Sequence, residues 1–123
     1  NRKDYDAARA AGSTILSVRH CRELGRDGVL AKIPDGVRYY MTIDIDGFDP
    51  SIAPGTGTPS HGGFLYYEVL EILQGLTKKG DVVGIDLVEV APDYDQTGNT
   101  AFLAAQLLMN VLGYIFHEKG KSA

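Results

Sequence analysis

The sequence has no tryptophan, a single cysteine and no excess of basic residues over its 123 positions. Because Cys21 stands alone, no intrachain disulfide can form, which excludes a secreted disulfide scaffold and predicts a reducing, cytoplasmic setting. The net charge of -4 argues against nucleic acid as a partner. No uninterrupted apolar run reaches the roughly 18–20 residues of a membrane span, so we expect no membrane partner.

The sequence does contain an alternation of helical and strand patterns, in a chain that is 44% hydrophobic. This length and composition fit one small domain. Apolar periodicity and turn residues predict, in order, a helix at 3–11, a strand at 13–18, a helix at 20–33, a strand at 37–43, a helix at 65–80, a strand at 81–90 and a helix at 100–117. This alternation is typical of an α/β fold built on a parallel sheet.

The two ends of the sequence carry further expectations. The helix at 100–117 is apolar almost all round, with Gln106, Asn110 and His117 on one stripe, so its other faces should be buried. The chain starts at Asn1 with what resembles the end of a helix, and we expect it to be a fragment of a longer protein.

The stretch YYMTIDIDGFDPSIAPGTGTPSHGG, residues 39–63, places two aspartates at the end of a predicted buried strand. If the strand runs on, period-2 alternation points Asp44 and Asp46 to the same side, where nearby carboxylates repel. A divalent cation removes that cost, and an all-oxygen site favours Mg²⁺, Ca²⁺ or Mn²⁺. The alternative is that the aspartates cap the following turn. An EF-hand is a poor match, because Asp49 and Gly55 stand where Gly and Glu are needed.

The loop at residues 50–63 is rich in proline and glycine, which restrict or permit particular backbone conformations. A shaped loop of this length inside a small domain usually belongs to a site. Thr56 and Thr58 offer hydroxyls to a polar ligand, with turn stabilisation as the alternative. His61 has no partner in the sequence and is expected to be a surface residue.

A second acidic pattern, GIDLVEVAPDYD, closes the predicted strand at 81–90. A carboxylate in a buried strand needs a partner, and alternation would point Asp86 and Glu89 to opposite sides. Glu89 is the better site candidate, because ligands of parallel sheets bind at the carboxyl ends of the strands. Asp86 has either a supporting role or a hydrogen-bonded place in the core. Asp93 and Asp95 are expected to cap the next helix.

These two motifs resemble the carboxyl-terminal half of the ureohydrolase family, which comprises arginase, agmatinase and related amidinohydrolases. TIDIDGFDPSIAPGTGTPSHGG is similar to the family signature, and GIDLVEVAPDYD follows at the family's usual distance. The segments PGTGTP and EVAPDYD are more similar to the corresponding segments of agmatinases than to those of arginases. The resemblance implies a three-layer, parallel-sheet, arginase-like α/β fold. Residues 1–123 would be the C-terminal part of a single ureohydrolase domain whose N-terminal half is absent from this sequence.

For the chemistry, the resemblance implies a binuclear manganese centre that hydrolyses a guanidino compound to urea and an amine. Asp44 matches the ligand that bridges both Mn²⁺ ions, and Asp46 matches a ligand of one of them. Glu89 matches the acid that receives the substrate guanidinium, and Thr58 matches a threonine that lines the substrate site. The first expected substrate is agmatine, cleaved to putrescine and urea, with guanidinobutyrate and guanidinopropionate as alternatives. The family also implies a homo-oligomer, a trimer or a hexamer.

The family's other metal ligands and its proton-transfer histidine belong to motifs that this sequence does not contain. We therefore expect residues 1–123 alone to be inactive and the N-terminal half of the protein to complete the site. Two other classes stay open. A glycosyltransferase could hold a metal-bound nucleotide sugar through Asp-x-Asp, although the extended loop match disfavours it. A non-catalytic binding or assembly module is the second.

Overall fold

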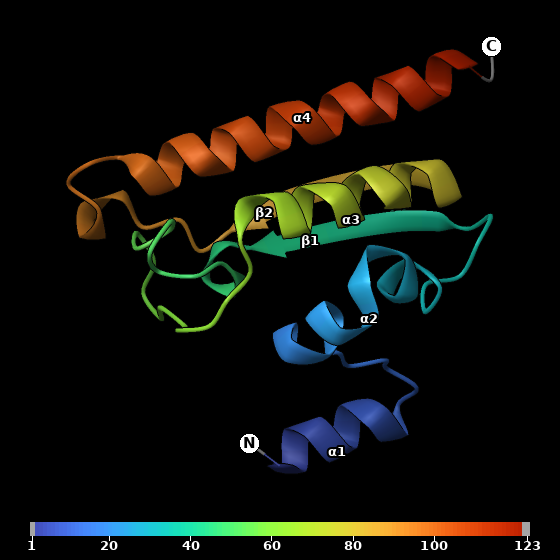
Figure 1. Ribbon diagram of the computed structural model, residues 1–123, viewed down its shortest axis with the longest axis horizontal. Coiled ribbons are helices and arrows are strands. Elements are labelled where there is room, and N and C mark those ends of the chain that lie inside the picture. Colours follow the sequence, from blue (N-terminus) through green and yellow to red (C-terminus); the bar gives the residue numbers. More distant parts are fainter. Residues whose placement is uncertain (1, 122–123) are drawn as a thin grey trace. The chain divides into compact units, whose positions relative to one another are not determined.

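The chain divides into two compact units, residues 1–33 and 34–123, and the computed structural model describes residues 2–121. The described helices and strands, labelled in Figure 1, are α1 (Arg2–Ala10), α2 (Val18–Leu30), β1 (Arg38–Asp44), α3 (Tyr66–Lys79), β2 (Asp81–Val88) and α4 (Asn99–Lys121). Two 3-10 turns, η1 (Ile45–Gly47) and η2 (Pro92–Tyr94), follow β1 and β2.

The first unit consists of α1 and α2, joined by a loop. Ser17 caps α2, because its hydroxyl accepts the backbone N–H of His20 at 3.2 Å. Gly25 interrupts α2 with a φ of 68°, a left-handed conformation that glycine adopts at low cost. The strand expected at 13–18 is wrong, because this stretch is loop until α2 begins at Val18. A β-branched run becomes a strand only beside a hydrogen-bonded neighbour, and the described residues of this unit supply none.

The second unit is built on β1 and β2, which pair in parallel. Asp44 pairs with Val88, so the two strands reach their carboxyl ends together. Alternate side chains of β1, such as that of Ile43, are buried on one face of the sheet. The strands expected at 37–43 and 81–90 are thus confirmed, with β1 shifted by one residue and β2 two residues shorter.

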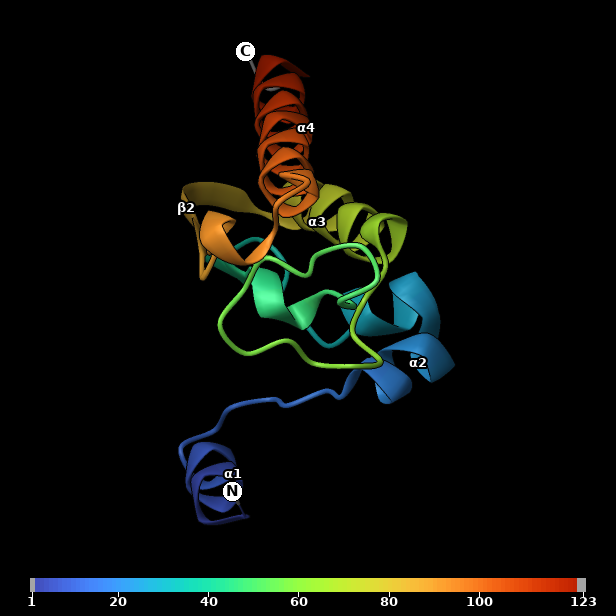
Figure 2. The ribbon, with the colours of Figure 1, turned by 90° about the vertical axis from the view of Figure 1, so that its left-hand side faces the viewer.

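α3 and α4 pack against one face of this sheet and enclose the core (Figures 1 and 2). Both helices and both strands contribute to that core, through Met41, Ile43, Leu70, Leu73, Val82, Leu103, Leu107 and Val111. Between the helices, the Asn110 amide donates to the Tyr66 hydroxyl at 2.8 Å. The two expected helices of this unit are therefore confirmed, and both pack against the same face of the sheet.

The expectation that α4 is buried except along one polar stripe is wrong. Phe102, Met109 and Phe116 are 75%, 70% and 70% exposed, whereas Asn110, which belongs to the polar stripe, bonds to α3. By length and composition α4 could also cross a membrane, a test that core helices of soluble proteins pass too. Leu107 of α4 is fully buried in the core. α4 is therefore a core helix with an additional exposed apolar side.

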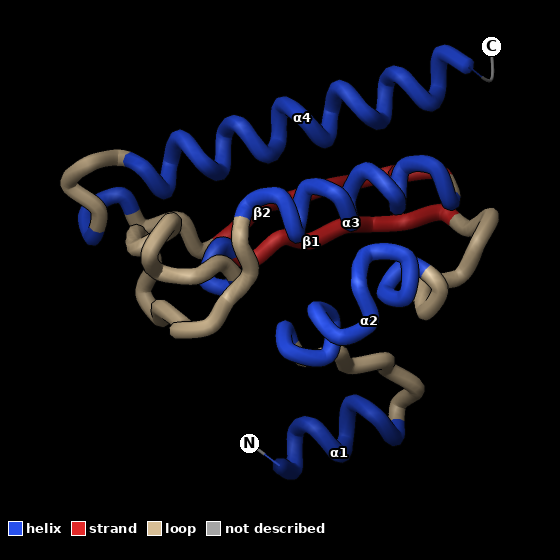
Figure 3. The backbone as a smooth tube through the Cα atoms, in the orientation of Figure 1, coloured by secondary structure: helices blue, strands red, loops and turns tan. Residues whose placement is uncertain are grey.

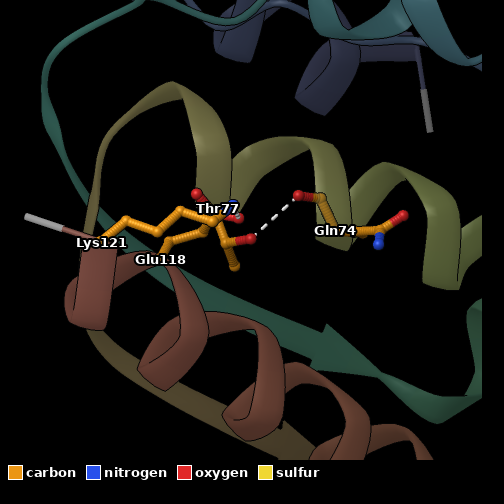
Figure 4. Close-up of polar contacts among 4 residues, drawn as sticks. All are labelled: Gln74, Thr77, Glu118 and Lys121. Carbon is orange, nitrogen blue, oxygen red and sulfur yellow. Dashed lines mark hydrogen bonds and ion pairs between the residues drawn. The ribbon is translucent and has the colours of Figure 1, made fainter.

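A cavity of about 440 Å³ lies at the amino end of the sheet, between the last turns of α3 and α4 and the start of β2. Charged groups in and around it form three ion pairs, Lys79–Asp35, Lys119–Asp81 and Lys121–Glu118, with N–O distances of 2.6, 3.2 and 2.9 Å. Figure 4 shows the Thr77 hydroxyl donating to the Gln74 carbonyl, at 2.9 Å. Because these charged and polar groups pair with one another, they do not indicate a ligand in the cavity.

Long loops gather at the opposite end, where both strands end (Figure 3). The loop after η1 is closed at its base by an isolated parallel pair between Phe48 and Phe64. Gly63 is needed at this crossing, because a Cβ there would lie 2.5 Å from the Phe48 carbonyl carbon. The loop predicted from its prolines and glycines is therefore anchored rather than free.

Asp49 adds a second anchor to this loop. Its carboxylate accepts the backbone N–H of Ser51 at 3.0 Å and that of Gly62 at 2.9 Å. These bonds, led by the contact with Ser51, lower the pKa of Asp49 to about 2, with a smaller effect from the charge of His61. Asp49 thus holds the turn that opens this loop, and His61 is exposed, as expected for it.

Candidate functional site

β1 delivers Asp44 to the carboxyl edge of the sheet as the last residue of the strand. Its Oδ1 accepts the backbone N–H of Asp46 at 3.2 Å and thereby caps η1. Alternation along a strand does not orient this pair, because β1 ends at Asp44 and Asp46 lies in the turn. Capping still leaves room for a cation, since Oδ2 of Asp44 accepts no hydrogen bond from the residues described here.

Asp46 is held by the loop that follows it. The Thr58 hydroxyl donates to Oδ2 of Asp46 at 2.5 Å, across twelve positions of sequence. Within residues 2–121, Oδ1 of Asp46 accepts no hydrogen bond. Each of the two aspartates therefore keeps one oxygen that can bind a cation.

Glu89 follows β2 in a backbone conformation that is unusual for a residue with a side chain. Its φ is 65°, and no other described non-glycine residue has a positive φ. This conformation costs on the order of 1–3 kcal/mol and is typical of functional positions. Because β2 ends at Val88, strand alternation does not set the direction of the Glu89 side chain, and the expected contrast with Asp86 does not follow from it.

Asp44, Asp46 and Glu89 form no ion pair with any described residue. Asp44 is the strand partner of Val88, so Glu89 comes one residue beyond that pair, on strands that lie about 4.8 Å apart. Uncompensated carboxylates at one edge favour a bound cation. No group of three or more His, Cys, Asp or Glu side chains that could hold a metal ion gathers in residues 2–121, so the described residues do not form a metal site by themselves.

Asp86 is hydrogen-bonded as expected, but it is only partly buried and lies on the sheet surface rather than in the core. Its carboxylate accepts the Thr42 hydroxyl at 2.5 Å and the Tyr40 hydroxyl at 2.7 Å. These bonds, led by that from Thr42, lower the pKa of Asp86, and the bond to Asp86 raises the pKa of Tyr40. Tyr40 and Thr42 alternate with Asp44 on one face of β1. Sequence analysis missed both hydroxyls, although their period-2 spacing before Asp44 was a usable signal.

A buried network fastens the loop at 50–63 to the start of α4. Asp95 accepts the backbone N–H and hydroxyl of Thr97 at 3.1 and 2.6 Å, and both groups of Thr100 at 2.7 Å. The Thr100 hydroxyl accepts the Gly55 N–H at 2.8 Å, and the Gly55 carbonyl accepts the Ala91 N–H at 2.8 Å. Asp95 therefore does cap α4, and it also joins the loops that follow β1 and β2.

Replacing Gly55 with alanine should destabilise the protein by about 1–3 kcal/mol, the usual cost of overpacking. A Cβ at this position would lie 2.8 Å from the Asp95 Cβ and 2.9 Å from the Thr100 hydroxyl oxygen. Gly57→Ala is the matched control, because a Cβ there meets nothing within 4 Å. Chemical denaturation of both variants measures the difference, and equal stability would contradict this packing.

The bonds to Asp95 also predict how stability depends on pH. They lower its pKa to about 2, the Thr97 hydroxyl having the largest effect, whereas an unfolded aspartate titrates near 3.9. Since the folded pKa is the lower one, the stabilisation is complete above about pH 4 and is lost as the pH falls toward 2. Urea midpoints should drop over that window, and Asp95→Asn should drop less. A folded Asp95→Asn protein with the wild-type pH slope would contradict this assignment.

Comparison with known proteins shows which of them share this chain's sequence and structure. A match to the Arginase family extends over residues 1–113. The chain belongs to the arginase family. Among curated members of this family, the chain is 39% identical over 113 residues to guanidinobutyrase of Pseudomonas aeruginosa and 41% identical over 113 residues to agmatinase of Salmonella paratyphi B. Among solved structures, it matches the agmatine ureohydrolase of Thermoplasma volcanium with a TM-score of 0.83 and 30% identity.

This arginase-family chain spans little more than a third of the length of those relatives. The alignments cover 89%, 89% and 99% of this chain, but 35% of the guanidinobutyrase, 37% of the agmatinase and 41% of the Thermoplasma structure. The expected arginase-like α/β fold with a parallel sheet is confirmed, and this chain forms a part of it.

Proposed function

We propose that this chain is the C-terminal part of a manganese-dependent ureohydrolase that cleaves a linear guanidino compound to urea and an amine. The observation that carries the proposal is a set of carboxylates, Asp44, Asp46 and Glu89, that lie at or just beyond the ends of two parallel strands of an arginase-family chain and form no ion pair within residues 2–121. The relatives named agmatinase and guanidinobutyrase support the reaction class. Agmatine is the preferred substrate, and guanidinobutyrate and guanidinopropionate are the alternatives.

We also propose that residues outside this chain, the N-terminal half of the protein, complete the domain and its site. The described sheet has two strands, so each strand has one unpaired edge. Parallel sheets are normally covered on both faces, whereas here Val83 and Val88 of β2 are 55% and 41% exposed. Phe102, Met109 and Phe116 of α4 are exposed as well. The share of the relatives that the chain covers, 35–41% in the three proteins compared, agrees with a missing part of this size.

Asp44 and Asp46 fit the ligand role by their chemistry. Oδ2 of Asp44 and Oδ1 of Asp46 are hard carboxylate oxygens with no other partner in the described chain, and such oxygens suit Mn²⁺. We assign Asp44 to both ions and Asp46 to one. When bound, two Mn²⁺ ions supply hydroxide near neutral pH and stabilise the charge that develops during attack on the guanidinium carbon.

Glu89 is assigned to the guanidinium group of the substrate. A carboxylate can accept two parallel N–H bonds from a planar guanidinium, which fixes both its position and its plane. Such orientation places the carbon for attack and lowers the entropic part of the barrier. The Thr58 hydroxyl gives its proton to Asp46 but retains lone pairs that can accept a guanidinium N–H. We therefore assign Thr58 to the lining of the substrate site, the role that the family resemblance implies for it.

The function is tested by urea release from the full-length protein, meaning the complete gene product that contains residues 1–123. Manganese-loaded protein is assayed with agmatine, guanidinobutyrate, guanidinopropionate and arginine at equal concentrations. We expect urea from a linear guanidino compound, and most from agmatine. A folded protein that holds manganese and releases no urea from any of them would contradict the proposal and favour a non-catalytic binding module.

A further inference from the structure

We propose that Thr58 is a positioning residue whose hydroxyl fixes the Asp46 carboxylate, so that the loop at 50–63 sets the affinity of the site for its cation. The identity of the cation as Mn²⁺ rests on the proposed function. The contact itself does not, because it joins two described side chains directly, with a donor–acceptor distance of 2.5 Å.

The geometry of the contact favours an orienting role. A hydrogen bond from a hydroxyl to a carboxylate is short, with a donor–acceptor distance of about 2.5–2.7 Å, and it is stronger than a hydrogen bond between neutral groups. It engages Oδ2 of Asp46 and leaves Oδ1 without a hydrogen bond among the described residues. Asp46 lies in a 3-10 turn rather than in a strand, so no strand alternation fixes its side chain. The bond to Thr58 therefore restricts which way the second oxygen points.

The loop around Thr58 has firm anchors on both sides of it. Gly55 is bound to Thr100 and Ala91, and Gly62 donates to Asp49 at 2.9 Å. Between these anchors, Thr58 bonds to a carboxylate of η1, whereas the Ser60 hydroxyl donates to the Thr58 carbonyl at 3.4 Å and to no other residue within 2–121.

Thr58 is itself exposed, so its substitution should not disturb the core. Partners that orient metal ligands typically change metal affinity by about 10–100-fold when they are lost.

The first measurement is a Mn²⁺ titration of the full-length protein in four forms. Thr58→Val keeps the shape but removes the hydroxyl, and should weaken Mn²⁺ binding about 10–100-fold. Thr58→Ser keeps the hydroxyl and should stay near wild type. Ser60→Ala is the matched control, because it removes a hydroxyl of the same loop that touches neither site aspartate, and should match wild type.

The second measurement uses metal-free protein and does not depend on activity. Amide hydrogen exchange of residues 57–61 should be faster in Thr58→Val than in wild type and unchanged in Thr58→Ser. Wild-type protein without ureohydrolase activity would overturn the proposed function but leave this test intact. Thr58→Val with wild-type Mn²⁺ affinity would overturn the positioning role, whatever its exchange rate. A raised KM as its only defect would then assign Thr58 to the substrate alone.

Discussion

Replacing Asp44 with alanine should remove most of the bound manganese from the full-length protein and lower urea release at least about 1,000-fold, more than the loss of an orienting partner costs. Asp44 is assigned to both ions, so its loss takes a ligand from each and leaves the remaining carboxylates to repel. Asp46→Ala should lose less metal, because Asp46 is assigned to one ion. Metal content and steady-state urea release are measured on the same preparation.

Asp35→Asn is the matched control for these variants. Asp35 is an exposed carboxylate before β1, at the opposite end of the sheet, and pairs with Lys79 at 2.6 Å. Because the Lys79 side chain is only 17% exposed, losing this ion pair should cost on the order of 1 kcal/mol or more of stability, with manganese content and urea release unchanged. Full manganese occupancy and normal urea release in Asp44→Ala would show that Asp44 only caps η1.

Glu89→Gln should lower kcat/KM by about 10–100-fold while manganese stays bound. Glutamine keeps the shape but lacks the charge, so a charge-assisted pair worth roughly 1.5–3 kcal/mol is lost. kcat should fall as well as KM rise, because a guanidinium carbon that is poorly aligned loses the benefit of proximity. Unchanged kinetics would remove Glu89 from the substrate site, and lost manganese would make it a metal ligand.

Glu89→Gly tests the strain at this position separately from the charge. Glycine adopts a φ of 65° freely, so this variant should be more stable than wild type by about 1 kcal/mol while losing activity. Glu89→Gln keeps a side chain on the same backbone and should leave stability unchanged. Equal unfolding free energies for the two variants would contradict the view that the strain is maintained for function.

The parts of the fold that the sequence predicted are those set by local pattern. β1 ends at Asp44 because a β-branched, apolar run meets a turn there. α3 follows an apolar period of three and four residues and ends at Lys79. Asp44 could be placed at a strand end for the same reason, but the orientation of Asp46, which lies in the 3-10 turn beyond that end, could not be predicted. Local pattern therefore placed the acidic pair without orienting it.

The parts that the sequence failed to predict depend on neighbours distant in sequence. The run at 13–18 has no strand beside it in the described unit, and the apolar side of α4 at Phe102 has no cover there. The left-handed φ of Glu89 and the bond from Thr58 to Asp46 arise from tertiary packing that no periodicity reports. The details that position the site were thus beyond sequence patterns.

The central claim is that Asp44 and Asp46 form part of a binuclear manganese centre completed by residues outside this chain. Manganese bound per protomer, measured side by side for the full-length protein and for residues 1–123 alone, tests it most directly. The account predicts about two Mn²⁺ ions in the full-length protein and only weak binding by residues 1–123. Tight stoichiometric binding by residues 1–123 alone, or no manganese in the full-length protein, would contradict it.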